Sequence, residues 1–263
     1  MDQIFQNMMT WAREAGDIQL SYFRGNDLDI TNKLCDSDIV TNADKASEQC
    51  LLRHIAETYP DHSVLAEESG ESDREGEYRW VIDPLDGTTN FSAGLPNFCV
   101  SIGLQRHGVT VAGVVYAPYL REMFCAVRGV GAFLNGNPIR VSGKQEPSKA
   151  VVCTGFPVDK ETNIDNNLDN FANIFSHVRG IRRLGSAAVD ICYCAAGFLD
   201  GFWELNIHDW DVCAAELIVE EAGGKVTRFR DDRGVSTCVG TPAIHDWLLT
   251  RLSTTPYTGG CLV

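Results

Sequence analysis

The sequence predicts a fold of the α/β class, α+β in type, in which a helical start, a run of antiparallel strands and a later series of alternating strands and helices share one core. The 263 residues open on an apolar stripe with helical spacing, continue into strand-like runs separated by glycine or proline, and then alternate. Because no flexible linker divides the chain, we expect a single domain over residues 1–263, with an N-terminal α+β portion (about 1–145) and a C-terminal α/β portion (about 146–263).

The first two elements are predicted to be helices. Apolar residues recur at steps of four and three near the N-terminus, and Gly25-Asn26 ends that helix. The residues of this apolar face are Ile4, Met8, Trp11, Ala15, Ile18 and Tyr22. Residues 26–43 are mostly polar, so we interpret them as a loop or mobile arm. Asn42 or Asp44 can then cap a second helix that runs to about Thr58.

The remaining elements follow from apolar runs and their breaks. A short strand at 62–66 leads into Glu67-Glu68, and the acidic residues and glycines of 69–78 predict a surface loop. Strand-like runs at 99–104, 110–116 and 122–127 predict an antiparallel sheet. The elements expected in the C-terminal portion are strands at 150–153, 178–184 and 200–205 and helices at 165–176, 187–196 and 211–222. Gly223-Gly224 is expected to close the last helix.

Composition limits the classes of function. The formal net charge of −14 disfavours non-specific binding to nucleic acid or to anionic membranes. Hydrophobic residues make up 44% of the chain, enough for a substantial core, but no stretch is long and apolar enough to span a bilayer. The N-terminus lacks the basic and apolar regions of a signal peptide. We therefore expect a cytoplasmic protein whose ten cysteines are reduced and mostly buried.

The most informative segment is Asp83-Pro84-Leu85-Asp86-Gly87-Thr88, which follows an apolar run. Pro84 fixes its own φ and biases Asp83 away from helix, so we expect the strand to break there and the two carboxylates to converge. Close carboxylates repel unless a hard cation with oxygen ligands lies between them. Gly87 and Thr88 then offer backbone N–H groups and a hydroxyl suited to phosphate. A turn with solvated acids is the simpler alternative, but a chance match to this pattern is on the order of one in ten thousand.

Two further carboxylates are candidates for the same site. Glu67 lies at a strand end before a loop, although an ordinary exposed glutamate would also fit there. Asp211 stands at the start of a helix, where capping is the alternative explanation. Trp210 would shield one side of a site at that point, and His208 is left without a role.

Three separated segments show a family resemblance. Ala66-Glu67-Glu68-Ser69, residues 80–91, and Trp210-Asp211 running into residues 221–224 occur in the order and spacing typical of the inositol monophosphatase family of magnesium-dependent phosphatases. The chain resembles that family over essentially its whole length. The resemblance implies a layered αβαβα sandwich of the kind shared with fructose-1,6-bisphosphatase, a homodimer, sensitivity to lithium, and an active site between the two portions.

The resemblance also implies roles for individual residues. Two Mg²⁺ ions would share Asp83, with a third, weaker ion near Glu67. The implied ligands are Glu67, Asp83, the backbone carbonyl of Leu85, Asp86 and Asp211. Gly87 and Thr88 would donate backbone N–H groups to the substrate phosphate, and a pair between Asp44 and the Thr88 hydroxyl, together with Glu67, would position the attacking water. The implied substrate contacts are Asp86, Ser186, Ala187, Glu204 and Asp211, with Lys33 and Arg182 as further positions.

The expected chemistry is hydrolysis of a small sugar or polyol phosphate by a metal-activated water, with inositol monophosphate as the first choice. Fructose 1,6-bisphosphate and histidinol phosphate stay open as substrates. Thr89 argues against a nucleotide bisphosphate, because relatives that hydrolyse one tend to have lysine there. Ala66 and Ala215 stand where the family often has glycine, and both are small. A regulatory, protein-binding member of the fold is the alternative from another class, and the complete set of carboxylates argues against it.

Overall fold

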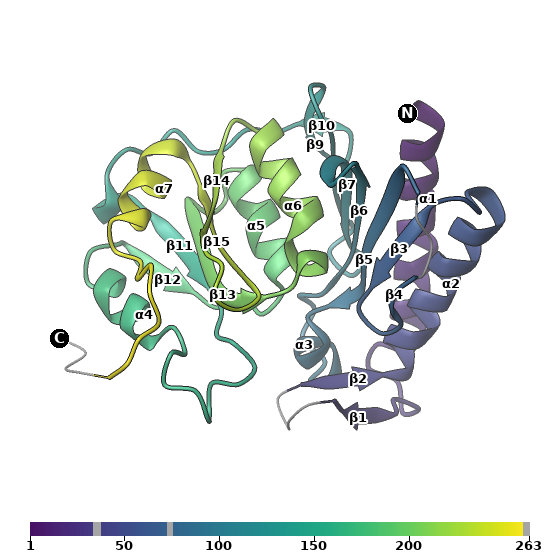
Figure 1. Cartoon of the computed structure of the whole chain (residues 1–263), viewed down its shortest axis with the longest axis horizontal. Helices are drawn as coiled ribbons and strands as arrows, with labels where there is room; N and C mark the ends of the chain where they lie inside the picture. The colour runs from purple at the N-terminus through teal and green to yellow at the C-terminus, as the bar shows by residue number, and fades with distance from the viewer. Residues whose placement is uncertain (34–37, 73–75, 260–263) are drawn as a thin grey trace.

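The computed structural model describes residues 1–33, 38–72 and 76–259, which form five layers (Figure 1). A large sheet lies between two pairs of helices, and a smaller sheet follows with a further pair on its far side. The three helical layers are α1 (Asp2–Tyr22) with α2 (Asn42–Thr58), α5 (Ala187–Ala195) with α6 (Asp209–Glu221), and α4 (Leu168–Phe175) with α7 (Pro242–Leu249). The expected αβαβα sandwich is confirmed.

Eight strands form the large sheet, in the order β10-β9-β8-β7-β6-β5-β3-β4. β3 and β5 pair in parallel, whereas the other neighbours are antiparallel. The bounds are β3 Ser63–Ala66, β4 Gly70–Glu71, β5 Tyr78–Asp86, β6 Cys99–Arg106, β7 Val109–Ala117, β8 Glu122–Val127, β9 Gly131–Leu134 and β10 Asn137–Pro138. The antiparallel sheet predicted from three strand-like runs is therefore present.

Five strands form the smaller sheet, in the order β12-β11-β13-β15-β14. Its first three strands are mutually parallel, and β15 and β14 join them antiparallel. The bounds are β11 Val151–Thr154, β12 Gly180–Arg182, β13 Gly201–Ile207, β14 Lys225–Arg230 and β15 Val235–Gly240. A short 3₁₀ turn, Pro147–Lys149, precedes β11. Parallel strands of this kind need crossover helices, which α4 and α5 supply.

The start of α2 differs from the prediction. Its N-cap is Thr41, and neither Asn42 nor Asp44 takes that position. The Thr41 hydroxyl accepts a hydrogen bond from the Ala43 N–H at 3.2 Å, while the Asp44 carboxylate accepts the Thr41 N–H at 2.9 Å. This reciprocal capping box satisfies N–H groups that the first turn of a helix leaves unpaired.

Two segments predicted to be loops contain short strands. β1 (Ile30–Asn32) and β2 (Ile39–Thr41) pair antiparallel within residues 26–43, of which 34–37 lie outside the described residues. β4 lies within 69–78, of which 73–75 lie outside them. Strands of two or three residues leave almost no alternation in the sequence, so the period-2 pattern could not reveal them.

The strand break expected at Pro84 is a bulge instead. β5 continues through Asp83-Pro84-Leu85-Asp86, and its pairing with β6 shifts register between Asp83 and Asp86. Asp83 lies opposite Ser101 and Asp86 opposite Cys99, so β5 carries one residue more than β6 over this interval. Proline, which has no N–H to donate to a ladder, is tolerated at such a bulge. Gln19 of α1 donates to the Pro84 carbonyl at 2.6 Å and helps to fix it.

Helix α6 lies directly against the large sheet because two strands offer glycine there. A Cβ at Gly113 of β7 would come within 2.7 Å of the Ala214 carbonyl oxygen, and one at Gly103 of β6 would collide with the Cys213 sulfur. Residues 212–215 of α6 are almost fully buried and mostly small. This close approach fixes where the first turn of α6 lies relative to the bulge in β5.

The described cysteines fit the expectation of buried thiols. Eight of them are buried, and no disulfide joins any of these. Within the described part of the chain, no helix combines the length and apolar character that a membrane crossing requires.

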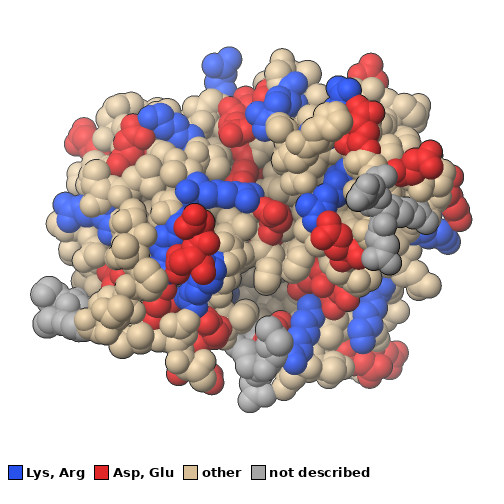
Figure 2. All heavy atoms as spheres, in the orientation of Figure 1, with Lys and Arg blue, Asp and Glu red and all other residues tan. Residues whose placement is uncertain are grey.

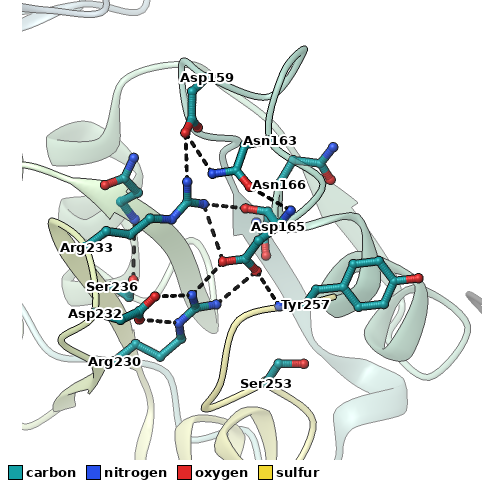
Figure 3. Close-up of polar contacts among 12 residues, drawn as sticks. Asp159, Asn163, Asp165, Asn166, Arg230, Asp232, Arg233, Ser236, Ser253 and Tyr257 are labelled. Carbon is teal, nitrogen blue, oxygen red and sulfur yellow. Dashed lines mark hydrogen bonds and ion pairs between the residues drawn. The ribbon is translucent and has the colours of Figure 1, made fainter. Parts of the chain in front are cut away.

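A buried ionic network holds the segment after β11 against the β14–β15 hairpin (Figure 3). Arg230 of β14 donates to both carboxylate oxygens of Asp165, at 3.1 and 2.6 Å, and also pairs with Asp232. Arg233 pairs with Asp159 at 2.8 Å. Tyr257 N–H donates to Asp165, which brings in the end of the described chain. The predicted helix at 165–176 therefore begins later, at Leu168, because Asp165 is held by these contacts.

Replacing Arg230 with methionine should destabilise the protein by about 3 kcal/mol, because it leaves the buried Asp165 carboxylate without its bidentate partner. Urea unfolding followed by fluorescence measures this change, and Arg179→Met, at an exposed arginine of the same portion, serves as the matched control. An Arg230→Met protein as stable as the Arg179→Met protein would show that the network contributes little.

Candidate active site

A cleft with a volume of about 480 Å³ lies between the two portions of the chain. In the space-filling view the molecule is hollowed there, with acidic and basic side chains both near the rim (Figure 2). The predicted site residues that line it are Glu67, Asp86, Gly87, Thr88, Ser186, Ala187, Glu204 and Asp211. The cleft thus collects residues from β5, α3 (Thr88–Ser92), β13, the first turns of α5 and α6, and Glu67 just after β3.

The bulge in β5 places two carboxylates. Asp83 is only 1% exposed, and one of its oxygens accepts the Leu85 N–H at 2.9 Å. Asp86 reaches across to the C-terminal portion, where its Oδ2 accepts the Ser186 hydroxyl at 2.6 Å and the Ala188 N–H at 2.7 Å. Ser186 is the N-cap of α5, so the Asp86 carboxylate lies at the positive end of that helix.

Asp211 and Asp44 each have a second function as the third residue of a helix. Asp211 accepts the His208 N–H at 2.6 Å, which makes it part of the capping box of α6. Asp44 does the same for α2 and in addition accepts the Thr88 hydroxyl at 3.0 Å. Capping and a role in the site are therefore compatible, since a carboxylate has two oxygens. The hydrogen bond expected between Asp44 and Thr88 is present.

Glu67 and Lys33 form an ion pair. The Lys33 ammonium lies 2.8 Å from Glu67 and 2.5 Å from Glu68. Burial lowers the pKa of Lys33, but attraction to the charges of Glu67 and Glu68, and the hydrogen bonds that Lys33 donates to them, outweigh that effect and raise it. Lys33 therefore remains a cation, and it places positive charge against the acidic cluster.

Burial and mutual repulsion raise the pKa values of the clustered carboxyl groups. Burial raises the pKa of Glu67 to about 7, although Lys33 opposes the shift. Burial, together with the charges of Glu67, Asp86 and Asp211, holds the pKa of Asp83 well above its usual range. The pKa of Asp211 is raised for the same reasons, burial first. A set of carboxylates that does not ionise readily at neutral pH needs an added positive charge to do so.

The donor set fits a hard divalent cation. The side chains that meet here offer carboxylate oxygens, the ligands that Mg²⁺ prefers, and the cluster has an excess of negative charge that a cation would neutralise. Leu85 is fully buried, and its carbonyl accepts the Thr88 hydroxyl at 3.0 Å, so this carbonyl also lies at the carboxylate-rich end of the cleft.

Gly87 fits the turn into α3 by its conformation. Its φ is +93°, in the left-handed region that favours glycine. A Cβ there would lie 2.9 Å from the Asn97 carbonyl oxygen and 3.2 Å from that of Gly185. Just beyond it, Asn90 donates to the carbonyls of Asn97 and Leu184, at 2.8 and 2.7 Å, and so ties the two portions together. Sequence reasoning did not identify Asn90.

The other end of the cleft is lined by the C-terminal portion. Glu204 on β13 is 9% exposed, and burial raises its pKa to about 8 while Arg183 opposes the shift. Glu204 fits beside β11 only because residue 155 is glycine, since a Cβ there would collide with its carboxylate. Asp190 of α5 also lines the cleft, and its Oδ2 accepts the Cys153 thiol at 3.1 Å.

The arginine that lines the cleft is Arg183, one residue after the predicted Arg182. Arg182 ends β12, is exposed, and donates to its own neighbour's carbonyl at 3.1 Å, whereas Arg183 is the arginine that lines the cleft. Side chains on an extended chain alternate in direction, so adjacent arginines face opposite ways. The signal that could have separated them is the register of β12 against β11, which sequence spacing does not contain.

Comparison with known proteins identifies the family. A model of the inositol monophosphatase family matches residues 1–253. The chain belongs to the inositol monophosphatase family. It is 46% identical over 220 residues to the Nus factor SuhB of Pasteurella multocida, covering 83% of this chain and 82% of that protein. It is 41% identical over 228 residues to the inositol-1-monophosphatase of a Synechocystis strain, covering 86% and 79%.

A solved structure agrees with the fold. The crystal structure of the extragenic suppressor protein suhB from Bartonella henselae superposes with a TM-score of 0.88 at 36% identity, over 95% of this chain and 98% of that one. The superposition therefore covers all but a small part of this chain.

Replacing Gly87 with alanine should destabilise the protein by about 2 kcal/mol and disturb the cleft, because the added methyl meets backbone atoms on both sides. Gly108→Ala is the matched control: its φ is +78°, but a Cβ there meets nothing within 4 Å. Thermal unfolding of both variants separates the cost of a positive φ from that of the clash. Equal losses in the two variants would show that the packing around Gly87 is unimportant.

Proposed function

We propose that this protein is a Mg²⁺-dependent phosphomonoesterase that hydrolyses a small sugar or polyol phosphate, with inositol monophosphate as the first choice. The observation that carries the proposal is that Glu67, Asp86 and Asp211 line one end of a cleft, beside the buried Asp83 that interacts with all three, while the other end offers polar groups for an alcohol. Membership of a magnesium-dependent family supports it.

The carboxylates would hold the metal ions. Glu67, Asp83 and the Leu85 carbonyl would bind one Mg²⁺, and Asp83, Asp86 and Asp211 a second. A third, weaker ion would lie near Glu67. When bound, Mg²⁺ supplies positive charge for the phosphate oxygens and activates water. Asp86 and Asp211 are fixed in advance, by the N-terminus of α5 and by the cap of α6, so little ordering is left for the binding step.

The chain itself would orient the reactants. The Thr88 hydroxyl oxygen lies 3.0 Å from both the Asp44 carboxylate and the Leu85 carbonyl, either of which can accept its single proton. Its lone pairs would then accept a hydrogen bond from the attacking water and position it. Burial raises the pKa of Asp44, while hydrogen bonds from Thr41 and Thr88 oppose the shift and favour the carboxylate form. The backbone N–H groups of Gly87 and Thr88 would bind phosphate oxygens at the turn into α3.

Residues of the C-terminal portion would bind the alcohol part of the substrate. Glu204 would accept hydrogen bonds from ring hydroxyls, and Ser186 and Ala187 would lie beside it. Asp86 and Asp211 would face the phosphate ester bond that is cleaved. Ser186 is itself held by Asp86, so its part is to position that carboxylate. Arg183, which lines the cleft, takes the place proposed for Arg182, and Lys33 would balance charge at the opposite end. Histidinol phosphate and fructose 1,6-bisphosphate are the alternative candidates for the substrate.

A second candidate is a partner-binding role. The relative from Pasteurella multocida and those from Pseudomonas aeruginosa and Escherichia coli are named Nus factors. Such a role would not need the carboxylates of the cleft. We further propose a cytoplasmic homodimer that binds neither nucleic acid nor membrane by itself, as its net charge of −14 favours.

Asp83→Asn should abolish nearly all Mg²⁺-dependent phosphate release, because Asp83 would be shared by both ions. The metal-free variant should be at least as stable as the wild type, since burial and the neighbouring carboxylates already raise the pKa of Asp83 and so favour an uncharged side chain there. Phosphate release is measured across inositol monophosphates, histidinol phosphate, fructose 1,6-bisphosphate and 3′-phosphoadenosine 5′-phosphate, with lithium as an inhibitor. Asp61→Asn, at an exposed aspartate, is the control.

Full activity in Asp83→Asn would refute the metal assignment. Absence of phosphate release by the wild type on every substrate, in a folded protein with Mg²⁺ present, would favour the partner-binding role. In that case Asp83→Asn would retain the partner function of the wild type.

Mg²⁺ binding should release protons and should tighten as pH rises from about 6 to 8, since ions bind the deprotonated carboxylates and the pKa of Glu67 is about 7 in their absence. Without Mg²⁺, the raised pKa values mean that the folded state binds more protons than the unfolded one. Stability should therefore fall as pH rises through about 7. Titration calorimetry in two buffers of different ionisation enthalpy counts the protons. Binding without proton release over this range would contradict the prediction.

A further inference from the structure

A group of three potential metal ligands lies outside the cleft, between the two helices of the first layer. Glu14 of α1 and Cys50 and His54 of α2 bring one ligand atom each to within 4.8 Å of one another. None of the three lines the cleft. The proposed phosphatase function leaves them without a role.

The helices explain why these side chains meet. Cys50 and His54 are four residues apart on α2, so they lie on the same helical face one turn apart. α1 packs along α2 and supplies Glu14 from the opposite side. The His54 Nε2 is 2.7 Å from the Glu14 carboxylate. Trp11, one turn before Glu14, stacks on the His54 ring with 5.3 Å between ring centroids and an angle of 7°, and so fixes the ring plane.

Burial differs among the three in a way that suits a metal site at a surface. The Cys50 side is closed, with only 8% of the residue exposed, while the Glu14 side chain is 46% exposed and that of His54 is 21% exposed. An ion there could be reached from solvent past Glu14. A fourth coordination position would remain open to water on the same side.

The donor types select the metal. One sulfur, one imidazole nitrogen and one carboxylate oxygen form a mixed set that suits Zn²⁺, whereas Mg²⁺ takes oxygen ligands almost exclusively. Ligand atoms around Zn²⁺ lie about 3 to 4 Å apart. The Glu14 and His54 atoms are already 2.7 Å apart, so the adjustment needed, on the order of 1 Å, lies between this pair and the Cys50 sulfur.

The Cys50 thiol has to lose its proton before it can bind a metal. Burial and the nearby Glu14 charge raise the pKa of the Cys50 thiol, so a thiolate is unfavourable there unless positive charge is added. The charge of the adjacent Arg53 and its hydrogen bond to the sulfur oppose this shift. A bound metal would have the same effect at shorter range. The alternative is a plain Glu14–His54 ion pair beside a buried thiol.

We propose that Glu14, Cys50 and His54 form a Zn²⁺ site that joins α1 to α2, separate from the carboxylate cleft. A metal there would tie together the outer helical layer, whose second helix also carries Asp44 and Glu48. Glu48 accepts the Glu68 N–H at 2.9 Å, so α2 contacts the acidic end of the cleft through its N-terminal half.

Cobalt spectroscopy tests the site, because Co²⁺ bound to a thiolate gives an intense near-ultraviolet charge-transfer band that a carboxylate site cannot produce. Reduced wild-type protein is titrated with Co²⁺ in excess Mg²⁺, which occupies oxygen ligands. We expect about one equivalent of Co²⁺ to develop the band and Zn²⁺ to displace it. Cys50→Ser should lose the band, and Glu14→Gln and His54→Gln should weaken Zn²⁺ binding at least ~10-fold in competition with a chromogenic chelator.

Matched variants separate this site from other ligands. Cys125→Ser changes a different, nearly buried cysteine, and His107→Gln and Glu57→Gln change exposed residues, so all three should keep the band and the affinity. Because Glu14 is half-exposed, Glu14→Gln keeps the fold even if Cys50→Ser does not. A band that persists in Cys50→Ser, or Zn²⁺ affinity unchanged in both Glu14→Gln and His54→Gln, would overturn the proposal. Zn²⁺ binding that is lost only in Asp83→Asn would place the ion in the cleft instead and would equally overturn it.

Discussion

Repulsion among buried carboxylates is the constraint on which the arrangement of this molecule depends. Glu67, Asp86 and Asp211 line one end of a cleft, and the buried Asp83 interacts with all three. Left to themselves, such groups would separate or become protonated. The fold opposes this by holding each carboxylate with a donor of its own: a backbone N–H for Asp83 and Asp211, a hydroxyl and an N–H for Asp86, and an ammonium for Glu67.

Backbone geometry, more than side-chain contact, brings these donors into place. In an uninterrupted strand, side chains three residues apart point to opposite faces of the sheet. The bulge in β5 instead turns Asp83 and Asp86 toward the same region. Glycines in β6 and β7 let α6 approach the sheet closely, which sets the position of Asp211 in its first turn. Asn90 and Asp86 both cross to the C-terminal portion, so the two sheets are joined at the cleft itself.

Much of this was predictable from the sequence, for identifiable reasons. The long apolar stripe of α1, the strand-like runs of β6 to β8 and the Asp-Pro-x-Asp-Gly-Thr segment are local patterns, and each appears where it was expected. The layered fold followed from the family resemblance. Two local predictions failed: Thr41 caps α2 in place of Asn42 or Asp44, and Pro84 lies in a bulge where a break was expected.

What the sequence could not show depends on register and on long-range packing. Arg183 rather than Arg182 reaches the cleft because of how β12 pairs with β11. Asp165 delays the start of α4 because Arg230, far along the chain, holds its carboxylate. Gly155 has no local signature, yet its missing Cβ is what admits Glu204. Each of these facts joins residues that only the folded chain brings together, so no window of sequence contains them.

The central claim is that the acidic cluster exists to hold divalent cations, and an anomalous-scattering experiment tests it most directly. Crystals of the wild type are soaked with Mn²⁺, which takes the same oxygen ligands as Mg²⁺ and scatters anomalously. We predict anomalous peaks in the cleft, one between Glu67 and Asp83 and one among Asp83, Asp86 and Asp211. A Mn²⁺-saturated crystal with no peak beside Asp83, and with Lys33 still against Glu67, would contradict the account.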